Sequence, residues 1–176
     1  MEKVSHEPNP LSLKDRNGLW LRNHSERTRG QLILIAEDSE ADIFFLFRVL
    51  DQAGVLNPIF VVRNGSEALS YLQGTGLYQD RAAYPVPGIV LLDLKLPGTD
   101  GFEVLRWTRD EPTLASTLMV AISSYDGVYS INLAYENGAD TFLSKPLTSD
   151  DILNLISAFD EYWDLVHSAH PDHRPA

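Results

Sequence analysis

The stretch V-L-L-D-L-K-L-P-G-T-D-G, residues 90–101, decides the fold of this chain. Three apolar residues run directly into Asp93, and a Pro-Gly turn follows before the expected start of a helix. Such an apolar run is typical of a strand that is buried on both faces, as in a parallel sheet. An acid where this strand ends lies at the carboxyl edge of the sheet, where open α/β folds bind ligands. Asp93 alone fits a simple turn equally well, so its meaning depends on its partners.

The composition favours one globular domain. The chain has 176 residues, of which 44% are hydrophobic and 22% charged, and this is enough for a real core. The sequence contains no apolar run of the ~18 residues that a membrane-spanning helix needs, and no apolar segment typical of a signal peptide. The absence of cysteine excludes disulfides and thiolate sites and fits a reducing compartment. We therefore expect a cytoplasmic protein that does not bind membranes.

The charge is distributed unevenly along the chain. Residues 1–30 hold six Lys or Arg and four Asp or Glu, which gives +2; the whole chain carries −11, so residues 31–176 carry −13. A body this acidic repels nucleic acid and anionic lipid, so we expect neither as a partner. Prolines and scattered charges without a period predict that residues 1–30 form a disordered or loosely attached arm.

Strand and helix signals alternate five times along residues 31–166. This pattern predicts a doubly wound α/β domain, in which a five-stranded parallel sheet carries helices on both faces. Residues 75–87 form an expected irregular loop with room for one helical turn, and residues 167–176 an expected polar tail. The expected strands are 31–36, 58–62, 88–92, 118–123 and 141–144; the expected helices are about 39–53, 64–74, 100–110, 127–137 and 148–166. The expected N-caps are Ser39, Asn64, Asp100 and Thr148, and Ser39 with Asp42 three residues later has the pattern of a capping box.

Four of the expected strands end in polar residues. Glu37 and Asp38 follow the first strand, Asp93 ends the third, Ser123 ends the fourth and Lys145 follows the fifth. Because parallel strands point the same way, these side chains can meet in one cleft. Each pair of carboxylates ~4 Å apart costs about 1–4 kcal/mol, depending on the effective dielectric. Mg²⁺ with oxygen ligands would relieve this repulsion.

One lysine and one Mg²⁺ balance three carboxylates, and a neutral pocket of this kind can receive a phosphoryl group. A carboxylate that attacks phosphorus forms an aspartyl phosphate. Mg²⁺ and Lys145 would spread the developing charge, while Ser123 would donate a hydrogen bond to a phosphoryl oxygen. Each residue alone also has an ordinary explanation, as a helix start, a strand end or a solvated charge. Their placement at four separate strand ends favours one shared site.

Together these motifs resemble the receiver domain of two-component response regulators. The spacings of 30 residues from Asp93 to Ser123 and of 52 residues from Asp93 to Lys145 also match the family. The resemblance covers about residues 31–166 and implies a flavodoxin-like strand order, 2-1-3-4-5. The matching segments are E-D-S at 37–39, L-L-D-L-K-L-P-G-T-D-G at 91–101, A-I-S-S at 121–124 and F-L-S-K-P at 142–146.

The resemblance implies a role for each matching residue at the acidic site. Asp93 would be the phosphoacceptor, and Lys145 would contact the phosphoryl group. Glu37, Asp38 and Asp93 would supply carboxylates to Mg²⁺, and the backbone carbonyl of Lys95 would be a further ligand.

The resemblance also implies a switch and a control of dephosphorylation. The Ser123 hydroxyl would follow the phosphoryl group, Phe142 would be the aromatic switch residue, and the Lys145-Pro146 bond would be cis. Lys95 and Tyr125 would tune dephosphorylation, because in the family these positions flank the path of the attacking water.

A narrower resemblance concerns stand-alone receivers that partner bacterial phytochrome histidine kinases. It rests on the E-D-S-E-A-D-I start at 37–43, the long loop before the third strand, and the aromatic residues Tyr162 and Trp163. It implies a single-domain regulator that takes its phosphoryl group from a sensor histidine kinase. Such a protein signals through phosphorylation-dependent protein–protein contacts, without a DNA-binding output domain.

The last expected helix predicts a homodimer. One apolar stripe of this helix should face the sheet, and a second stripe should remain at the surface. An exposed apolar patch marks an interaction surface, so we expect a twofold dimer through the last helix and the tail. The preceding helix adds Tyr129 and Tyr135 to the expected surface. The inner stripe is Ile152, Ile156, Phe159 and Trp163, and the outer stripe is Leu155, Tyr162 and Val166.

Two other functions fit parts of the pattern. A phosphohydrolase of the haloacid dehalogenase type also uses an Asp nucleophile, but it needs a second Asp two residues later, where this chain has Lys95. A nucleotide-binding domain would carry G-x-G-x-x-G after the first strand, where residues 36–41 read A-E-D-S-E-A. We therefore expect a phosphorylated signalling protein and not an enzyme that turns over substrate.

Overall fold

The computed structural model describes residues 31–165. The expected N-terminal arm, residues 1–30, lies outside the described residues, as does the expected tail, 167–176. Both therefore stay predictions. No helix within residues 31–165 is long and apolar enough to cross a bilayer.

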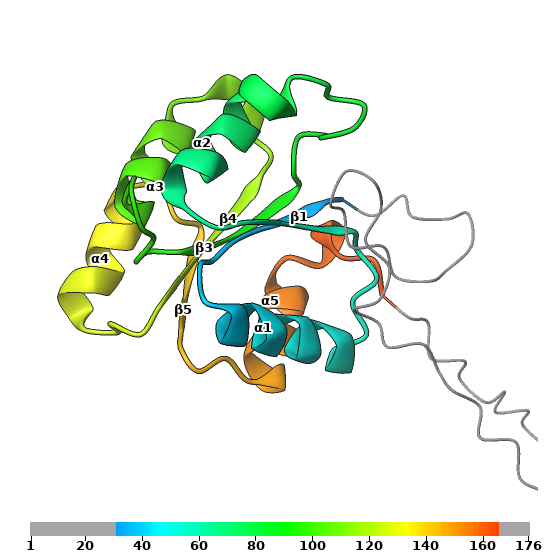
Figure 1. Cartoon of the computed structure of the whole chain (residues 1–176). Helices are drawn as coiled ribbons and strands as arrows, with labels where there is room; N and C mark the ends of the chain where they lie inside the picture. Colours follow the sequence, from blue (N-terminus) through cyan, green and yellow to red (C-terminus); the bar gives the residue numbers. More distant parts are fainter. Residues whose placement is uncertain (1–30, 166–176) are drawn as a thin grey trace, which may run out of the picture.

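Five parallel strands form one sheet in the order β2-β1-β3-β4-β5 (Figure 1). This confirms the predicted sheet and its strand order. The central strands are fully buried, because helices cover both of their faces. The strands are β1 (Ile33–Ala36), β2 (Ile59–Val62), β3 (Ile89–Asp93), β4 (Leu118–Ser123) and β5 (Thr141–Ser144).

The helices lie in two layers, with α2, α3 and α4 on one face of the sheet and α1 and α5 on the other (Figure 1). Predicted caps start most of them: Ser39, Asn64, Asp100 and Thr148 each accept a hydrogen bond from a backbone N–H of the first turn. The helices are α1 (Glu40–Gln52), α2 (Gly65–Gln73), α3 (Gly101–Arg109), α4 (Val128–Glu136) and α5 (Ser149–Ala158). Short 3₁₀ turns are η1 (Gly76–Tyr78), η2 (Pro112–Leu114) and η3 (Asp160–Tyr162).

The hydrophobic core has one part on each face of the sheet. Alternate residues of β1 show the division: Leu34 and Ala36 pack in the part under α2, α3 and α4, whereas Ile33 and Ile35 pack under α1 and α5. This alternation follows from the period of two along a strand. The same alternation determines on which face of the sheet the last side chains of each strand lie.

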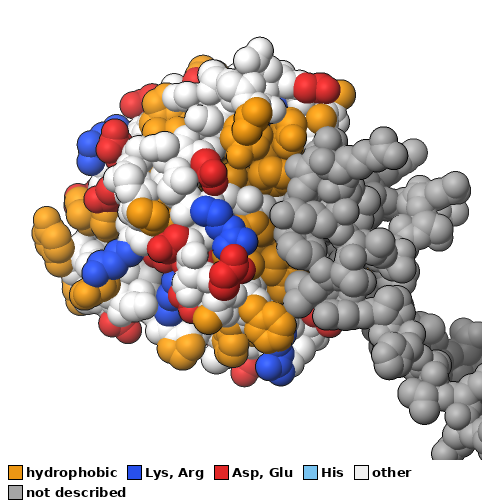
Figure 2. Space-filling model, in the orientation of Figure 1, with side chains coloured by type: hydrophobic (Ala, Val, Ile, Leu, Met, Phe, Trp, Pro, Cys, Tyr) orange, Lys and Arg blue, Asp and Glu red, His pale blue; other side chains and the backbone are white. Residues whose placement is uncertain are grey.

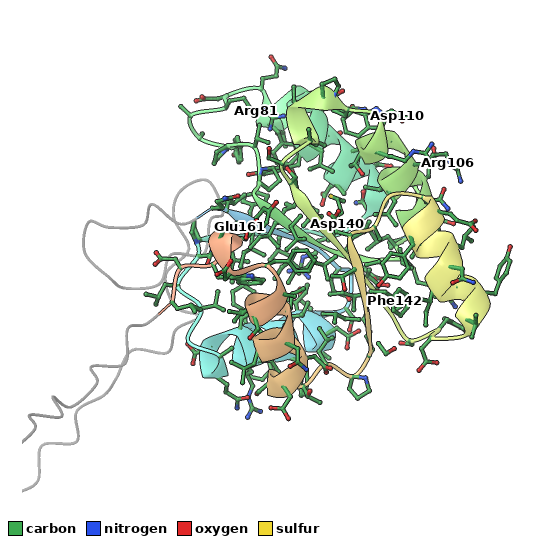
Figure 3. The ribbon with its side chains drawn as sticks, turned by 180° about the vertical axis from the view of Figure 1, so that it is seen from behind. Arg81, Arg106, Asp110, Asp140, Phe142 and Glu161 are labelled. Atoms are coloured by element: carbon green, nitrogen blue, oxygen red, sulfur yellow. The ribbon has the colours of Figure 1, made fainter. Side chains whose placement is uncertain are left out.

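The loop between α2 and β3 is built around an aromatic cluster. It contains the predicted single helical turn, η1. Tyr71 lies 5.0 Å from both Phe60 and Tyr78, measured between ring centroids, and Tyr84 stands edge-on to Tyr78 at 5.2 Å. Arg81 extends toward the end of α2 (Figure 3), where its guanidinium donates hydrogen bonds to the carbonyls of Tyr71, Leu72 and Tyr84. The bonds to Tyr71 and Leu72 add donors to carbonyls at the end of α2, and the bond to Tyr84 ties the loop to this helix end.

The last helix is shorter than predicted. α5 ends at Ala158, and a 3₁₀ turn replaces the expected continuation to residue 166. Buried Asn57 explains the change, because its side chain donates to the carbonyls of Gln31 and Tyr162 and accepts from the Asp164 N–H. These bonds hold the chain after α5 in a non-helical path across the start of the sheet.

This path also corrects the predicted outer stripe of the last helix. Leu155 is only 3% exposed and belongs to the core, and Tyr162 is half-buried and packs against the same core. Val166, the third member of the stripe, lies outside the described residues. The prediction that Leu155 lies at the surface is therefore wrong. Tyr162 exposes less of its side chain than the prediction required.

Candidate functional site

The strand β3 carries Asp93 to the carboxyl edge of the sheet, and the loop after it is tightly folded. Asp93 is 7% exposed. Gly98 has a φ of 75°, which favours glycine. At Gly101, a Cβ would lie 2.6 Å from the Leu94 Cα and 2.7 Å from the Asp93 carbonyl oxygen. Only glycine lets the start of α3 approach the end of β3 so closely, and this packing fixes the backbone of Asp93.

Three carboxylates meet at this edge, as predicted. One ligand atom each from Glu37, Asp38 and Asp93 lies within 4.8 Å of the others. Glu37 is 2% exposed, whereas Asp38 is exposed. Burial is the main cause that raises the pKa of Glu37 above its ordinary value, and hydrogen bonds from Lys145 and the Ser39 N–H oppose it. Hard oxygen donors that converge in this way suit a divalent cation, so the donor set fits one.

Lys145 lies among the carboxylates. Its Nζ donates to Glu37 Oε2 at 2.6 Å, to Asp42 Oδ2 at 2.8 Å and to Asp93 Oδ2 at 2.9 Å. Partial burial disfavours its charge, but the hydrogen bonds to Asp42, Glu37 and Asp93 outweigh burial and hold the pKa of Lys145 above its ordinary value. The lysine therefore stays charged and offsets part of the repulsion among the acids.

The hydroxyl site also has the predicted place. Ser123 ends β4, one position beyond Ile122, which is the register partner of Asp93 on β3, and it is 3% exposed. Its Oγ accepts a hydrogen bond from the Tyr125 N–H at 3.0 Å, and the Asp93 Oδ1 accepts one from the Lys95 N–H at 2.8 Å. The Lys95 ammonium lies 3.7 Å from the centroid of the Tyr125 ring. Lys95 and Tyr125 thus contact each other beside the site. Lys95 lies two positions after Asp93, and Tyr125 lies two positions after Ser123.

Phe142 and the Lys145-Pro146 bond are two further features that the sequence analysis named. Phe142 lies on β5 (Figure 3), and its half-buried ring packs against the core part that α2, α3 and α4 cover. The Lys145-Pro146 peptide bond is cis, as predicted. The structure contains no interaction that tests the backbone carbonyl of Lys95 as a metal ligand, so that assignment stays a prediction.

Asp42 is a site residue that the sequence analysis missed. Its position three residues after Ser39 indicated a capping box, in which its carboxylate would return to the backbone of Ser39. Only half of that box forms: the Asp42 N–H donates to Ser39 Oγ, whereas the Ser39 N–H donates to Glu37 Oε1. The Asp42 carboxylate contacts Lys145 instead. The sequence did offer one signal for this role: Asp42 is an acid in the first turn of the helix that follows the first strand.

The comparison with known families decides what this constellation is. A family model described as the response regulator receiver domain matches residues 33–157, well over half of the chain. The chain belongs to the response regulator receiver domain family. Receiver domains of this kind are signalling proteins, and the predicted family is confirmed.

Several relatives of this receiver domain are response regulators of phytochromes. Response regulator Rcp1 of Synechocystis sp. is 29% identical over 133 residues, which cover 76% of this chain and 88% of Rcp1. The solved bacteriophytochrome response regulator RtBRR has a TM-score of 0.70 and 30% identity, over 81% of this chain and 85% of its own. The predicted likeness to phytochrome response regulators is therefore confirmed.

Two related solved structures bear on the site. One is the Mn²⁺-bound form of Rcp1, with a TM-score of 0.63 and 28% identity over 81% of this receiver chain and 99% of Rcp1. The other is the phosphorylated cyanobacterial phytochrome response regulator RcpA, with a TM-score of 0.64 and 28% identity over 80% and 97%. A divalent metal and a phosphoryl group are thus described for relatives that share this fold.

Proposed function

We propose that Asp93 accepts a phosphoryl group and that this modification controls protein–protein contacts of the receiver. The observation that carries the proposal is the convergence of Asp93, two further carboxylates and Lys145 at one edge of the sheet. A buried aspartate that is fixed by its own loop and faces a charged lysine is suited to attack phosphorus.

We propose Mg²⁺ as the metal of this site. Glu37, Asp38 and Asp93 would hold it, with the backbone carbonyl of Lys95 as a further ligand. When bound, Mg²⁺ supplies positive charge to phosphoryl oxygens. The protein's own part is to keep the three carboxylates within reach of one ion and to hold the charge of Lys145 beside the Asp93 carboxylate.

Ser123 and Phe142 form the proposed switch. The Ser123 Oγ only accepts a hydrogen bond from the Tyr125 N–H, so its own proton remains available to donate to a phosphoryl oxygen. Phe142 lies on β5, the strand beside Ser123, and its ring is half-buried. A shift of Ser123 toward the phosphoryl group would give this ring room to change its packing against α4.

The proposed donor is a sensor histidine kinase in the cytoplasm, and we propose a bacteriophytochrome in particular. The support is the likeness to RtBRR and to Rcp1. The acidic body, with −13 over residues 31–176, disfavours nucleic acid and anionic membranes as partners.

We also propose that the receiver forms a homodimer, but on a changed argument. Burial of Leu155 removes much of the expected patch on the last helix. The part of the expected surface on α4 does hold exposed apolar side chains: Val128 is 75%, Tyr129 78% and Tyr135 46% exposed. Hydrophobic side chains stand out at the α4 edge of the molecule (Figure 2). The dimer surface would then include α4 together with the chain after α5.

A phosphohydrolase of the haloacid dehalogenase type is not favoured. Lys95 occupies the place of its second Asp, and the lysine side chain turns to the Tyr125 ring. The site thus offers no acid at the position that would protonate a leaving group in such an enzyme.

Phosphotransfer from a purified, autophosphorylated bacteriophytochrome kinase tests the proposed donor. The receiver should take up label within seconds to minutes, and it should do so faster than from an unrelated histidine kinase. Equal rates from both kinases would contradict the specific partner, while leaving phosphorylation by kinases as such intact.

A further inference from the structure

Every donor of the Lys145 ammonium is in use. An ammonium has three N–H donors, and the three acceptors at 2.6, 2.8 and 2.9 Å are carboxylate oxygens of Glu37, Asp42 and Asp93. The side chain of Lys145 is only 16% exposed. The Lys145 ammonium therefore has no N–H donor left for a further anion unless one of these three hydrogen bonds breaks.

The three carboxylates are not equally easy to release. The Glu37 side chain is 2% exposed, and it would become an unpaired buried charge without Lys145. Asp93 loses its negative charge when its carboxylate becomes an acyl phosphate. The Asp42 side chain is 45% exposed, so water can replace the ammonium at low cost.

The surroundings of Asp42 leave room for that release. A pocket of about 360 Å³ opens beside the Asp42–Lys145 pair, and its lining includes both residues together with Phe45 and Pro146. The carboxylate of Asp42 can turn into this space without displacing the core. Its place on α1 is secured separately, because the backbone N–H of Asp42 bonds to Ser39 Oγ.

We propose that Asp42 is a positioning residue, which holds Lys145 in the unphosphorylated protein and competes with the phosphoryl group for its ammonium. The inference rests on the proposed phosphorylation of Asp93. Removing the Asp42 carboxylate should free one of the three N–H donors of Lys145 and strengthen the contact of the lysine with a phosphoryl group, without a loss of fold.

The test compares Asp42→Asn and Asp42→Ala with Glu40→Gln. Glu40 lies in the same first turn of α1, and it pairs with Arg63 and not with Lys145, so Glu40→Gln removes the same charge without touching the lysine. Asp42→Glu keeps a carboxylate and serves as the rescue variant. Thermal melts establish that each variant is folded.

The first measurement uses metal-free protein and the nitrogen resonance of the Lys145 ammonium. In the wild type and in Glu40→Gln its protons should exchange slowly with water, because three carboxylates hold them. Both Asp42→Asn and Asp42→Ala should speed this exchange, and Asp42→Glu should restore slow exchange. Unchanged exchange in both Asp42 variants would overturn the proposal.

The second measurement is the affinity for beryllofluoride, a phosphoryl mimic, in the presence of Mg²⁺. Both Asp42 variants should bind it about two- to tenfold more tightly than wild type, as expected for release of one half-exposed ion pair. Glu40→Gln should change the affinity much less. Equal effects of Glu40→Gln and Asp42→Asn would show a general charge effect and overturn the competition. If the wild type bound no beryllofluoride, the proposed function would fail, and the ammonium exchange would still decide whether Asp42 holds Lys145.

Discussion

The Lys95 ammonium lies 3.7 Å from the centroid of the Tyr125 ring, so a cation–π contact joins the loops that follow β3 and β4. The backbone N–H groups of the same two residues donate to Asp93 and Ser123. The pair therefore lies next to the proposed phosphoryl position, and neither side chain is suited to orient an attacking water.

We expect a phosphoryl lifetime of minutes or longer in the isolated protein, because this pair crowds the path of water. Lys95→Asn combined with Tyr125→Glu should shorten the lifetime by about tenfold or more, since a carboxylate can orient water. Loss of labelled phosphate over time measures it. Leu77→Glu, a change at an exposed residue of η1, is the control and should have no effect. A wild-type lifetime of a few seconds would contradict the expectation.

Metal binding should stabilise the fold and depend on Asp38. Mg²⁺ at 100 times its Kd should add about 2.7 kcal/mol to the free energy of unfolding. Asp38 belongs to the acidic cluster but is absent from the three carboxylates that bind Lys145. Asp38→Asn should therefore leave the metal-free melting temperature equal or slightly higher, while it removes most of the Mg²⁺-induced rise. An undiminished rise in this variant would argue against Asp38 as a ligand.

Stability at alkaline pH should depend on Tyr71. Burial raises the pKa of its hydroxyl above the ordinary value of about 10, and the hydroxyl donates to the Pro85 carbonyl at 3.1 Å. Because the unfolded chain loses this proton first, the contribution of Tyr71 is complete below pH ~10 and is lost as the pH rises further.

Urea unfolding of Tyr71→Phe measures this contribution. At neutral pH the variant should be less stable by about 1 kcal/mol, owing to the lost hydrogen bond. Above pH ~10 its stability should fall less steeply than that of the wild type, so the difference narrows. Tyr129→Phe, which removes a hydroxyl at the surface, is the control for loss of a tyrosine hydroxyl at neutral pH and should leave the free energy of unfolding there unchanged. Parallel curves for wild type and Tyr71→Phe would rule out a raised pKa.

The proposed homodimer can be tested by light scattering at micromolar concentration. The wild type should be dimeric, and Val128→Asp combined with Tyr129→Asp on α4 should make it monomeric. Leu77→Asp, at an 84% exposed residue of η1, should leave the dimer intact. A chain cut after Asp164 tests the part played by the tail. A monomeric wild type would refute the dimer, and a dimeric α4 variant would refute this surface.

The sequence predicted the sheet and most of the site because both depend on local signals. Each of these signals depends on only a few neighbouring positions. Examples are the apolar run before Asp93, the helix caps such as Thr148, and the polar residues at strand ends. The register of parallel strands then brings these ends together without further information.

The mistaken parts depend on contacts between distant residues. Periodicity alone favoured a helix to residue 166, but Asn57, more than 100 positions earlier, binds the backbone at Tyr162 and Asp164. Asp42 fitted a local cap, and only the approach of Lys145 across 103 positions gives its carboxylate another partner. The hydrogen bonds of Arg81 that order its loop, and the cation–π pair of Lys95 and Tyr125, also join separate segments. No pattern within a single segment predicts them.

The most direct test of the account is chemical mapping of the modified acid. Wild type and Asp93→Asn are treated with acetyl phosphate and Mg²⁺, and borohydride then reduces any acyl phosphate to an alcohol, which peptide mass spectrometry locates. We expect homoserine at position 93 in the wild type and no stoichiometric modification of the variant. Modification of another acid in the wild type, or stoichiometric labelling of Asp93→Asn, would contradict the assignment of Asp93 as the phosphoacceptor.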